Sequence, residues 1–285
     1  MSYAADPPPM TNRAPARVAF VDSGIGLLGY ADALHALRPD LELVLALDPD
    51  NMPYGPRTPA EVRELILQSA RSAAELEPAA IVVACNTASV HGLDALRAEF
   101  EPGVPVIGTV PAIRPAASTG GPVSIWSTAA TSSSDYLRGL VDAFASDIET
   151  HSIAALGLAE AVEAADPEAI DQAIGAALAW TPEDTEALVL GCTHYGLVAD
   201  RIAAAWRARG SEVPIFDSPI AVARQTLRRI GLAPDERATP TEVRPTVLLS
   251  GRRGELPERL RMYPQGARLL SRGSSGRTTR PTLAS

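Results

Sequence analysis

The chain has 285 residues, 46% of them hydrophobic and 21% charged, and its formal net charge is −9. This composition is typical of globular proteins, and the longest apolar runs, AIVVAC and ALVLGC, are far shorter than the roughly 18 residues of a membrane-spanning helix. All 25 basic residues are Arg, and they are scattered before residue 252. This pattern argues against a nucleic-acid surface and excludes chemistry that needs a lysine amine, including the usual attachment of pyridoxal phosphate.

The two ends of the chain differ in composition from its centre. Residues 1–14 contain three consecutive prolines and lack the basic start and apolar segment of a secretory signal. Residues 272–285 are rich in Ser, Gly, Thr and Arg. We expect both ends to be mobile and the protein to be cytoplasmic.

Short aliphatic runs alternate with helix-patterned segments, as in proteins built from β-α units around parallel sheets. One helix is predicted over residues 58–76, where Pro59 suits the first helical position because its missing N–H would be unpaired there. The expected fold class is therefore α/β. Strands are predicted near Val18–Val21, Leu41–Leu47, Ala80–Ala84, Val104–Ile107, Val123–Trp126, Ser152–Ala155, Ala187–Leu190, Val213–Phe216 and Thr246–Leu249.

An internal repeat relates the two halves of the chain. IVVACNTAS followed by PVIGTVPA parallels LVLGCTHYG followed by PIFDSP. Asp22 lies 63 residues before Cys85, and Thr128 lies 64 residues before Cys192. We therefore expect two pseudo-symmetric parallel-sheet lobes, flavodoxin-like or Rossmann-like, with a site in the cleft at the carboxyl ends of their strands. The predicted lobes are residues 15–118 with 219–271, and residues 119–218.

The only two cysteines occupy corresponding positions in the halves. Cys85 is followed by Asn86-Thr87 and Cys192 by Thr193-His194, so each thiol ends a predicted strand next to polar residues that would begin a helix. The partial positive charge of a helix N-terminus favours a thiolate. A single cysteine at a strand end is more often an inert core residue. Two in repeat-related positions indicate paired chemistry.

Other uses of these cysteines are weaker interpretations. Cys85, Cys192 and His194 contain no C-x-x-C pair, so a zinc site is disfavoured and no metal is expected. The cysteines are 107 residues apart in a chain expected to be cytoplasmic, which disfavours a structural disulfide. A reversible redox pair stays open as an alternative.

Six motifs together resemble those of a known family. DSGIGLL, DPDNMPYG, ACNTAS, PVIGTVPAI, STAATSSSDY and LGCTHY are similar, in order and spacing, to the motif series of the glutamate racemases of the aspartate/glutamate racemase family. The resemblance covers residues 18–197, and PTVLLSGRRGEL fits the family's last strand more loosely. Related aspartate racemases usually carry Glu at the position of His194, so the GCTH form favours glutamate.

The resemblance implies a mechanism. A racemase removes the α-proton from one face of an amino acid and delivers a proton to the other, which needs two acid/base groups in opposite protonation states. The family assigns these roles to Cys85 and Cys192, each a thiolate base in one direction and a thiol acid in the other. No cofactor is expected, and fixed hydrogen-bond donors and charges would stabilise the carbanion.

Further residues match the family's functional positions. The resemblance makes Asp22 the carboxylate that assists Cys85, His194 the assistant of Cys192, and Glu163 an acidic residue near the second thiol. By itself, Glu163 would be interpreted more simply as an exposed helical residue. Hydroxyls, amides and backbone N–H groups at the ligand-contacting positions would bind two carboxylates and an ammonium. These positions are Asp22, Ser23, Tyr54, Gly55, Asn86, Thr87, Thr128, Thr131, Thr193 and His194.

The chain departs from the family pattern around the expected rim of the cleft. Leu27 replaces the second Gly of DSGxGG, Asn51 a common Arg, and Gly196 the Pro that usually follows GCTHY. Ala155-Leu156 lacks a frequent Cys-Pro, and Glu160 stands in place of a Pro. These differences bear on substrate identity and turnover more than on reaction class.

The sequence thus predicts an isomerase that racemises L-glutamate to D-glutamate without a cofactor and supplies D-glutamate for peptidoglycan synthesis. One alternative is a racemase of aspartate or another amino acid from the same superfamily. Another is a catalytically weak regulatory paralogue that binds an acidic amino acid. The expected partner is the small-molecule substrate, with no nucleic acid or membrane, and a homodimer of undefined geometry is expected.

Overall fold

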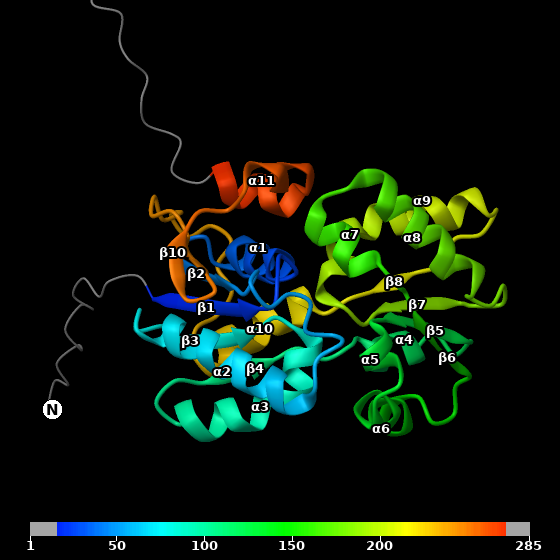
Figure 1. Cartoon of the computed structure of the whole chain (residues 1–285), viewed down its shortest axis with the longest axis horizontal. Helices are drawn as coiled ribbons and strands as arrows, with labels where there is room; N and C mark the ends of the chain where they lie inside the picture. The colour runs from blue at the N-terminus through cyan, green and yellow to red at the C-terminus, as the bar shows by residue number, and fades with distance from the viewer. Residues whose placement is uncertain (1–15, 272–285) are drawn as a thin grey trace, which may run out of the picture.

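The aliphatic runs of the sequence form two sheets, one in each lobe of the computed structural model, which describes residues 16–271 (Figure 1). The predicted mobile ends, 1–14 and 272–285, lie outside the described residues. The first sheet contains β1 (Arg17–Asp22), β2 (Glu42–Leu47), β3 (Ala80–Val83), β4 (Val106–Gly108), β9 (Thr246–Leu249) and β10 (Arg252–Gly254). The second contains β5 (Val123–Ser127), β6 (Thr150–Ala154), β7 (Ala187–Leu190) and β8 (Ile215–Phe216).

The two sheets repeat one strand order. The first runs β10-β9-β2-β1-β3-β4 and the second β6-β5-β7-β8, so the arrangement β2-β1-β3-β4 recurs in the second lobe with equivalent strands. Within this repeated four-strand arrangement, neighbouring strands are parallel in both lobes. The order matches the first four strands of the flavodoxin-like sheet. The internal repeat of the sequence is therefore a repeat of topology, and the predicted two-lobe α/β fold is confirmed.

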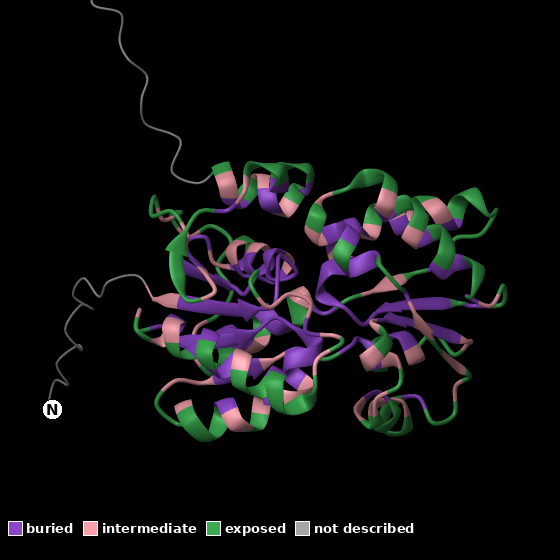
Figure 2. Cartoon of the chain, in the orientation of Figure 1, coloured by how far each residue is buried: buried purple, intermediate pink, exposed green. Residues whose placement is uncertain are grey.

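Helices cover both faces of each sheet, which explains why the central strands β1, β2, β3, β5 and β7 are almost fully buried, whereas β6 is partly exposed and β10 fully exposed (Figure 2). The first lobe contains α1 (Leu27–Leu37), α2 (Pro59–Ala74), α3 (Asn86–Phe100), α10 (Pro219–Arg229), the 3₁₀-helix η2 (Glu258–Met262) and α11 (Pro264–Ser271). The second contains α4 (Ile113–Ala117), α5 (Ala129–Ser132), α6 (Asp135–Phe144), α7 (Leu158–Ala164), α8 (Pro167–Ala179), the 3₁₀-helix η1 (Thr193–Val198) and α9 (Ala199–Ala208).

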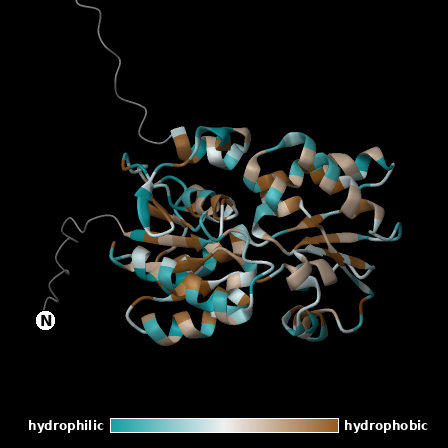
Figure 3. Ribbon diagram, in the orientation of Figure 1, coloured by the Kyte–Doolittle hydropathy of each residue, from teal (hydrophilic) through white to brown (hydrophobic). Residues whose placement is uncertain are grey.

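One apolar core crosses from lobe to lobe. A cluster of buried side chains includes Phe20 and Leu45 of the first sheet, Trp126 and Leu190 of the second, and Leu28 of α1 between them. Apolar colour is concentrated on the strands and inner helix faces, and polar colour on the outer faces (Figure 3). Burial of this shared surface stabilises the association of the lobes.

The chain passes between the lobes twice. After β4 it enters α4, whose Ile113 and Ala116 pack with Val123 and Val189 of the second sheet. After β8 it returns to α10, which packs against α1. The division into one lobe of residues 15–118 with 219–271 and a second lobe of residues 119–218 stays a prediction. Helix α4 lies before the predicted boundary at residue 118, yet it packs on the second sheet.

All nine predicted strands are present, with shifted ends. The predicted strand Val213–Phe216 shortens to β8, and the strand predicted at Val104–Ile107 is β4. The sequence prediction missed β10, an antiparallel edge strand whose residues are all exposed, because RRG has no apolar pattern. Within residues 16–271, no helix is both long and apolar enough to cross a membrane.

Helix α2 illustrates how local chemistry fixes an element. Thr58 accepts a hydrogen bond from the Glu61 backbone N–H, and the Glu61 carboxylate accepts one from the Thr58 backbone N–H. This capping box satisfies two donors that a helix start leaves unpaired, and Pro59 occupies the first turn. The helix therefore begins where the Thr-Pro pair predicted, and it ends at Ala74, two residues before the predicted end.

Candidate active site

A small cavity of about 30 Å³ lies between the lobes at the carboxyl ends of β1, β3, β5 and β7. Most of the predicted site residues line it, and the exceptions are Glu163 and Thr131. Four lining residues were not predicted, of which two, Met52 and Pro53, lie inside the DPDNMPYG motif. The lining residues are Asp22, Ser23, Met52, Pro53, Tyr54, Gly55, Cys85, Asn86, Thr87, Thr128, Ala159, Gly191, Cys192, Thr193 and His194.

The two cysteines are free thiols that follow equivalent strands of the two sheets, β3 and β7. Cys85 is 5% exposed and Cys192 is 9% exposed, and both face the same cavity. The repeated topology thus places one thiol on each side of the cleft. This arrangement is the one that the repeat in the sequence predicted.

Cys85 lies at the N-terminus of α3, where the Ala88 backbone N–H donates to Sγ at 3.5 Å. The Ser23 hydroxyl is 4.0 Å from the same sulfur. Burial and the charge of Asp22 nevertheless raise the pKa of Cys85 well above its usual value, although the Ala88 N–H opposes them. The N-terminus of α3 thus favours a thiolate at Cys85, as expected, but desolvation of the charge is the larger effect and raises the pKa overall.

Asp22 is a fully buried carboxylate at the end of β1. Its Oδ1 accepts from the Ser23 backbone N–H at 2.7 Å, and its Oδ2 accepts from Thr193 Oγ1, on the other lobe, at 3.2 Å. Burial raises the pKa of Asp22 to about 6, while the nearby His194 and a hydrogen bond with Cys85 lower it. Asp22 can therefore exchange a proton near neutral pH beside Cys85.

Cys192 has different neighbours. It precedes the 3₁₀-helix η1 and its side chain receives no capping hydrogen bond, whereas His194 Nδ1 lies 4.0 Å from its sulfur. The other ring nitrogen of His194, Nε2, donates to Glu163 Oε2 at 2.9 Å. A chain of thiol, imidazole and carboxylate thus leads away from the cavity on this side.

The carboxylate of Glu163 stands behind His194 rather than in the cavity. Its Oε2 also accepts from the Ile25 backbone N–H at 2.8 Å, so a residue of α7 is bound to the loop before α1 on the other lobe. The side chain of Glu163 is 19% exposed, and the simpler interpretation of an exposed helical Glu is wrong. A sequence pattern could not reveal this placement, because it depends on how the lobes meet.

The interaction between His194 and Glu163 shifts the pKa values of both residues. Burial lowers the pKa of His194, but hydrogen bonds to Cys192 and Glu163 and the charge of Asp22 outweigh it and raise the pKa well above its usual value. Burial raises the pKa of Glu163, but the hydrogen bond and charge of His194 and the Ile25 N–H lower it overall. The imidazolium and the carboxylate therefore stabilise each other.

Gly24 and Gly26 of the DSGIG motif lie where side chains of the second lobe approach the backbone too closely for a Cβ atom. A Cβ at Gly24 would lie 2.1 Å from Glu163 Oε2 and 2.9 Å from His194 Nε2. A Cβ at Gly26 would lie 2.2 Å from Thr193 Oγ1 and 2.7 Å from Asp22 Oδ2. The bare backbone lets the second lobe bring its polar side chains against the first. Leu27, which replaces a family glycine, is fully buried in the core instead.

The remaining predicted residues form the walls. Asn86 is buried, and its Oδ1 has no hydrogen-bond partner among the described residues, so it is an available acceptor in the cavity. Gly55 lies against Thr128 of the opposite lobe, since a Cβ there would be 3.7 Å from Thr128 Cβ. Thr131 lies one layer further out, where its hydroxyl accepts from Thr128 Oγ1 at 3.1 Å.

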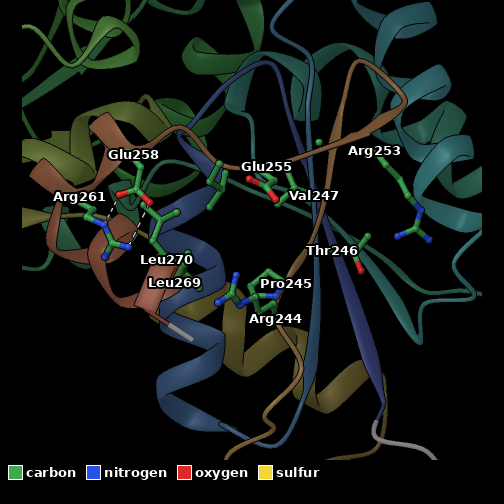
Figure 4. A pocket seen from close by; sticks show the side chains of 12 residues that line it. Arg244, Pro245, Thr246, Val247, Arg253, Glu255, Glu258, Arg261, Leu269 and Leu270 are labelled. Atoms are coloured by element: carbon green, nitrogen blue, oxygen red, sulfur yellow. Dashed lines mark hydrogen bonds and ion pairs between the residues drawn. The ribbon is translucent and has the colours of Figure 1, made fainter. Parts of the chain in front are cut away.

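A larger cavity of about 430 Å³ lies elsewhere, beside β9, β10 and α11 (Figure 4). Arg261 there is bound to Glu258, and Arg253 lies at the opposite end of the lining. It holds neither thiol nor any residue of the predicted site. Among residues 16–271, no three His, Cys, Asp or Glu side chains are grouped as they would be around a metal ion.

Comparison with known proteins agrees with this geometry. Residues 29–226 match the family model described as Asp/Glu/Hydantoin racemase. A glutamate racemase from Salmonella gallinarum is 34% identical over 238 residues, which cover 79% of this chain and 81% of that protein. The chain belongs to the Asp/Glu/Hydantoin racemase family. The predicted resemblance and the predicted enzyme class, an isomerase, are thereby confirmed.

Solved structures of this family are also similar. The Escherichia coli glutamate racemase, crystallised with L-glutamate and the activator UDP-MurNAc-ala, is 28% identical with a TM-score of 0.73, and the match covers 90% of this chain and 93% of that one. The Thermus thermophilus glutamate racemase, in complex with β-chloro-D-alanine, is 28% identical with a TM-score of 0.63 over 92% of this chain and 95% of that one. The racemase fold therefore extends over nearly the whole described chain.

Proposed function

We propose that this racemase interconverts L- and D-glutamate by a two-thiol mechanism without a cofactor. The observation that carries the proposal is the pair of free thiols, Cys85 and Cys192, which end equivalent strands of two lobes and face one cavity. An α-carbon held between them would meet one proton acceptor and one proton donor on opposite faces, as racemisation requires. The lack of lysine in the sequence supports a mechanism without pyridoxal phosphate.

Proton transfer is assigned as follows. In one direction a thiolate at Cys85 removes the α-proton and a thiol at Cys192 delivers a proton to the other face; the reverse direction exchanges the roles. Asp22 accepts or returns the proton of Cys85, since its pKa is near neutral and it is hydrogen-bonded there. The His194–Glu163 pair does the same for Cys192, because the imidazolium stabilises a neighbouring thiolate.

Glutamate is proposed as the substrate because relatives similar in sequence are glutamate racemases and one related structure contains L-glutamate. The unpartnered Asn86 Oδ1 would accept from the α-ammonium. The Thr87 hydroxyl would donate to the substrate carboxylates, and the hydroxyls of Ser23, Thr128 and Thr193 would rotate from Asp22 and Thr131 to do the same. Charge that develops on the α-carboxylate in the transition state would be stabilised by the same fixed donors.

Substrate binding requires the lobes to move. A cavity of about 30 Å³ has room for little more than a water molecule and is too small for an amino acid. We therefore propose that the lobes separate to admit substrate and then close around it to exclude water. The two crossings, between β4 and α4 and between β8 and α10, are the places where such a motion would bend the chain.

The deciding experiment follows the α-proton signal of L-glutamate by NMR in D2O, with purified protein and no added cofactor, together with a chiral assay of the product. We expect loss of the signal and accumulation of D-glutamate. No exchange with glutamate but exchange with aspartate would move the substrate to aspartate. Saturable binding of glutamate without exchange would instead support a regulatory amino-acid-binding protein.

We also propose that D-glutamate made by this chain serves peptidoglycan synthesis, that the enzyme acts in the cytoplasm, and that it is a homodimer. The first two follow from the metabolic role implied by the family, and the third from family resemblance alone. Sedimentation equilibrium of the purified full chain tests the dimer, which a single monomeric species at micromolar concentration would contradict.

A further inference from the structure

A buried carboxylate behind the cavity wall belongs to none of the residues assigned so far. Asp48 follows β2 and is 3% exposed. Its Oδ2 accepts from the Tyr54 hydroxyl at 2.8 Å. Its Oδ1 accepts from Ser250 Oγ at 2.7 Å and from Asn51 Nδ2 at 3.0 Å. A buried charge with three donors is well satisfied, and it fixes the positions of all three partners.

One of these partners, Ser250, comes from a distant part of the chain. It occupies the turn between β9 and β10 with φ +45°, a conformation uncommon for a residue with a Cβ. Pairing of Leu249 with Leu47 along β9 and β2 holds this turn beside Asp48. Ser250 Oγ also accepts from the Asp50 backbone N–H at 3.1 Å. The C-terminal hairpin is therefore fastened to the 48–55 loop.

A second partner of Asp48, Tyr54, connects this network to the cavity. Its side chain is 1% exposed and packs in the apolar cluster that contains Cys85, Val62 and Ile66. Tyr54 and its neighbours Pro53 and Gly55 line the cavity, and Gly55 lies against Thr128 of the other lobe. The ring thus anchors the part of the first lobe that forms the wall opposite Thr128.

The anchor depends on a phenol that stays protonated. Burial and the charge of Asp48 raise the pKa of Tyr54 above its usual value, so its hydroxyl remains a donor at neutral pH. Asn51, which stands where the family commonly has Arg, donates an amide N–H to Asp48 and does not neutralise it. In this chain the carboxylate is left as a full acceptor for Tyr54 and Ser250.

We propose that Asp48, held in place by Ser250, is a positioning residue that fixes the Tyr54–Gly55 wall and thereby sets the affinity for substrate. The inference rests on the proposed racemisation for its kinetic readout, but substrate binding tests it separately. Asp48 touches neither thiol in any hydrogen bond of the described structure, so its loss should weaken binding rather than proton transfer.

The test measures kcat and KM for L-glutamate, and its Kd by calorimetry, for Asp48→Ala, Ser250→Ala and the control Asp50→Asn. Asp50 lies in the same loop and pairs with Arg252 at 2.7 Å, but it does not touch Tyr54. We expect Asp48→Ala to raise KM and Kd about tenfold and to change kcat less than about threefold. Ser250→Ala should give a smaller rise of about threefold, and Asp50→Asn none.

A double-mutant cycle with Tyr54→Phe separates positioning from general loss of structure. Once the phenol is removed, Asp48→Ala should raise Kd much less than it does in the wild-type background. Additive effects, or a loss of kcat with unchanged KM and Kd, would overturn the proposal. If Asp48→Ala does not fold, the same cycle is run with Ser250→Ala. Absence of α-proton exchange by the wild-type protein would contradict the proposed function, whereas the Kd values would still decide the role of Asp48.

Discussion

The two thiols of this racemase stand at the same point of a repeated fold but in different surroundings. Cys85 caps an α-helix and lies beside a buried carboxylate, Asp22. Cys192 precedes a 3₁₀-helix and lies beside an imidazole that is bound to a carboxylate, in the pair His194–Glu163. The backbone repeats, whereas the groups that control protonation do not.

This difference shows that the strand topology places the two sulfurs, whereas the residues beside each sulfur control its protonation. Repetition of the β2-β1-β3-β4 order places one sulfur on each side of the cleft. Local residues then differ: burial and Asp22 favour the protonated thiol at Cys85, while Cys192 lies beside His194, whose pKa is raised by hydrogen bonds to Cys192 and Glu163. A pair that must hold opposite protonation states benefits from unequal neighbours.

The largest expected effect comes from removing either thiol. Cys85→Ser and Cys192→Ser should each lower kcat/KM for racemisation by at least about a thousandfold, because a hydroxyl is a far weaker base than a thiolate. The two enantiomers are equally stable, so the loss must be the same from L- and D-glutamate. A chiral assay in both directions measures it, with circular dichroism as the check on folding. Near wild-type activity in either variant would refute the two-thiol mechanism.

Asp22→Asn should separate activity from stability. We expect activity to fall about a hundredfold, since the amide cannot exchange a proton with Cys85. Burial raises the pKa of Asp22 from its usual 3.8 to about 6 in the folded protein, so its charge destabilises the fold fully above pH 6 and costs nothing below pH 3.8. The variant should therefore be more stable than wild type by roughly 3 kcal/mol at pH 8.

Urea unfolding at pH 8 and pH 4 checks this expectation. The stability difference between Asp22→Asn and wild type should nearly vanish at pH 4, where wild-type Asp22 is protonated in the folded state. Asp50→Asn, in which an exposed carboxylate is replaced, serves as the control. A difference of equal size at both pH values would show that the buried charge is not its cause.

The fold and the thiol pair were predictable from the sequence for an identifiable reason. Alternating aliphatic and helical segments, with cysteines at the same place in two similar halves, encode the β-α repeat and the strand ends that face the cleft. Asp22 and His194 were accessible too, because they lie beside the motifs that carry the sulfurs. These residues could be found because the pattern that identifies them lies within a few neighbouring positions of the sequence.

Other features depend on contacts across the molecule: family resemblance alone pointed to Glu163, and the contact of Ser250 with Asp48 was not predicted. Glu163 reaches His194 and Ile25 only because α7 packs against the other lobe, and Ser250 reaches Asp48 only because β9 pairs with β2. The strand β10 was missed because its polar, exposed residues show no alternation. No periodicity in the sequence specifies these long-range contacts.

A smaller effect is expected where the Cys192 side meets the first lobe. Gly24→Ala would place a methyl group 2.1 Å from Glu163 Oε2 and so push Glu163 away from His194. We expect kcat/KM to fall about tenfold. Gly29→Ala is the matched control, since its Cβ would have only ordinary contacts at 4.0 Å in α1. Equal activity of the two variants would mean that the close approach at Gly24 is not needed.

The smallest effect, and the sharpest test of the asymmetry, is expected from Glu163→Gln. The amide retains a hydrogen-bond acceptor for His194 Nε2 but removes the charge that helps to raise the pKa of His194. The imidazolium is then lost at lower pH, so the alkaline limb of kcat/KM should move to lower pH and the rate at neutral pH should fall a few-fold.

The direction of proton transfer reveals which thiol has been affected. With α-deuterated L- and D-glutamate, the primary isotope effect should increase for the enantiomer that Cys192 deprotonates, because that step becomes more rate-limiting. It should decrease for the other enantiomer, because its deprotonation by Cys85 becomes less rate-limiting. Equal changes for both enantiomers would mean that Glu163 acts on the whole cleft through its bond to Ile25. The two sides of the site would then be coupled, and their different neighbours would not act independently.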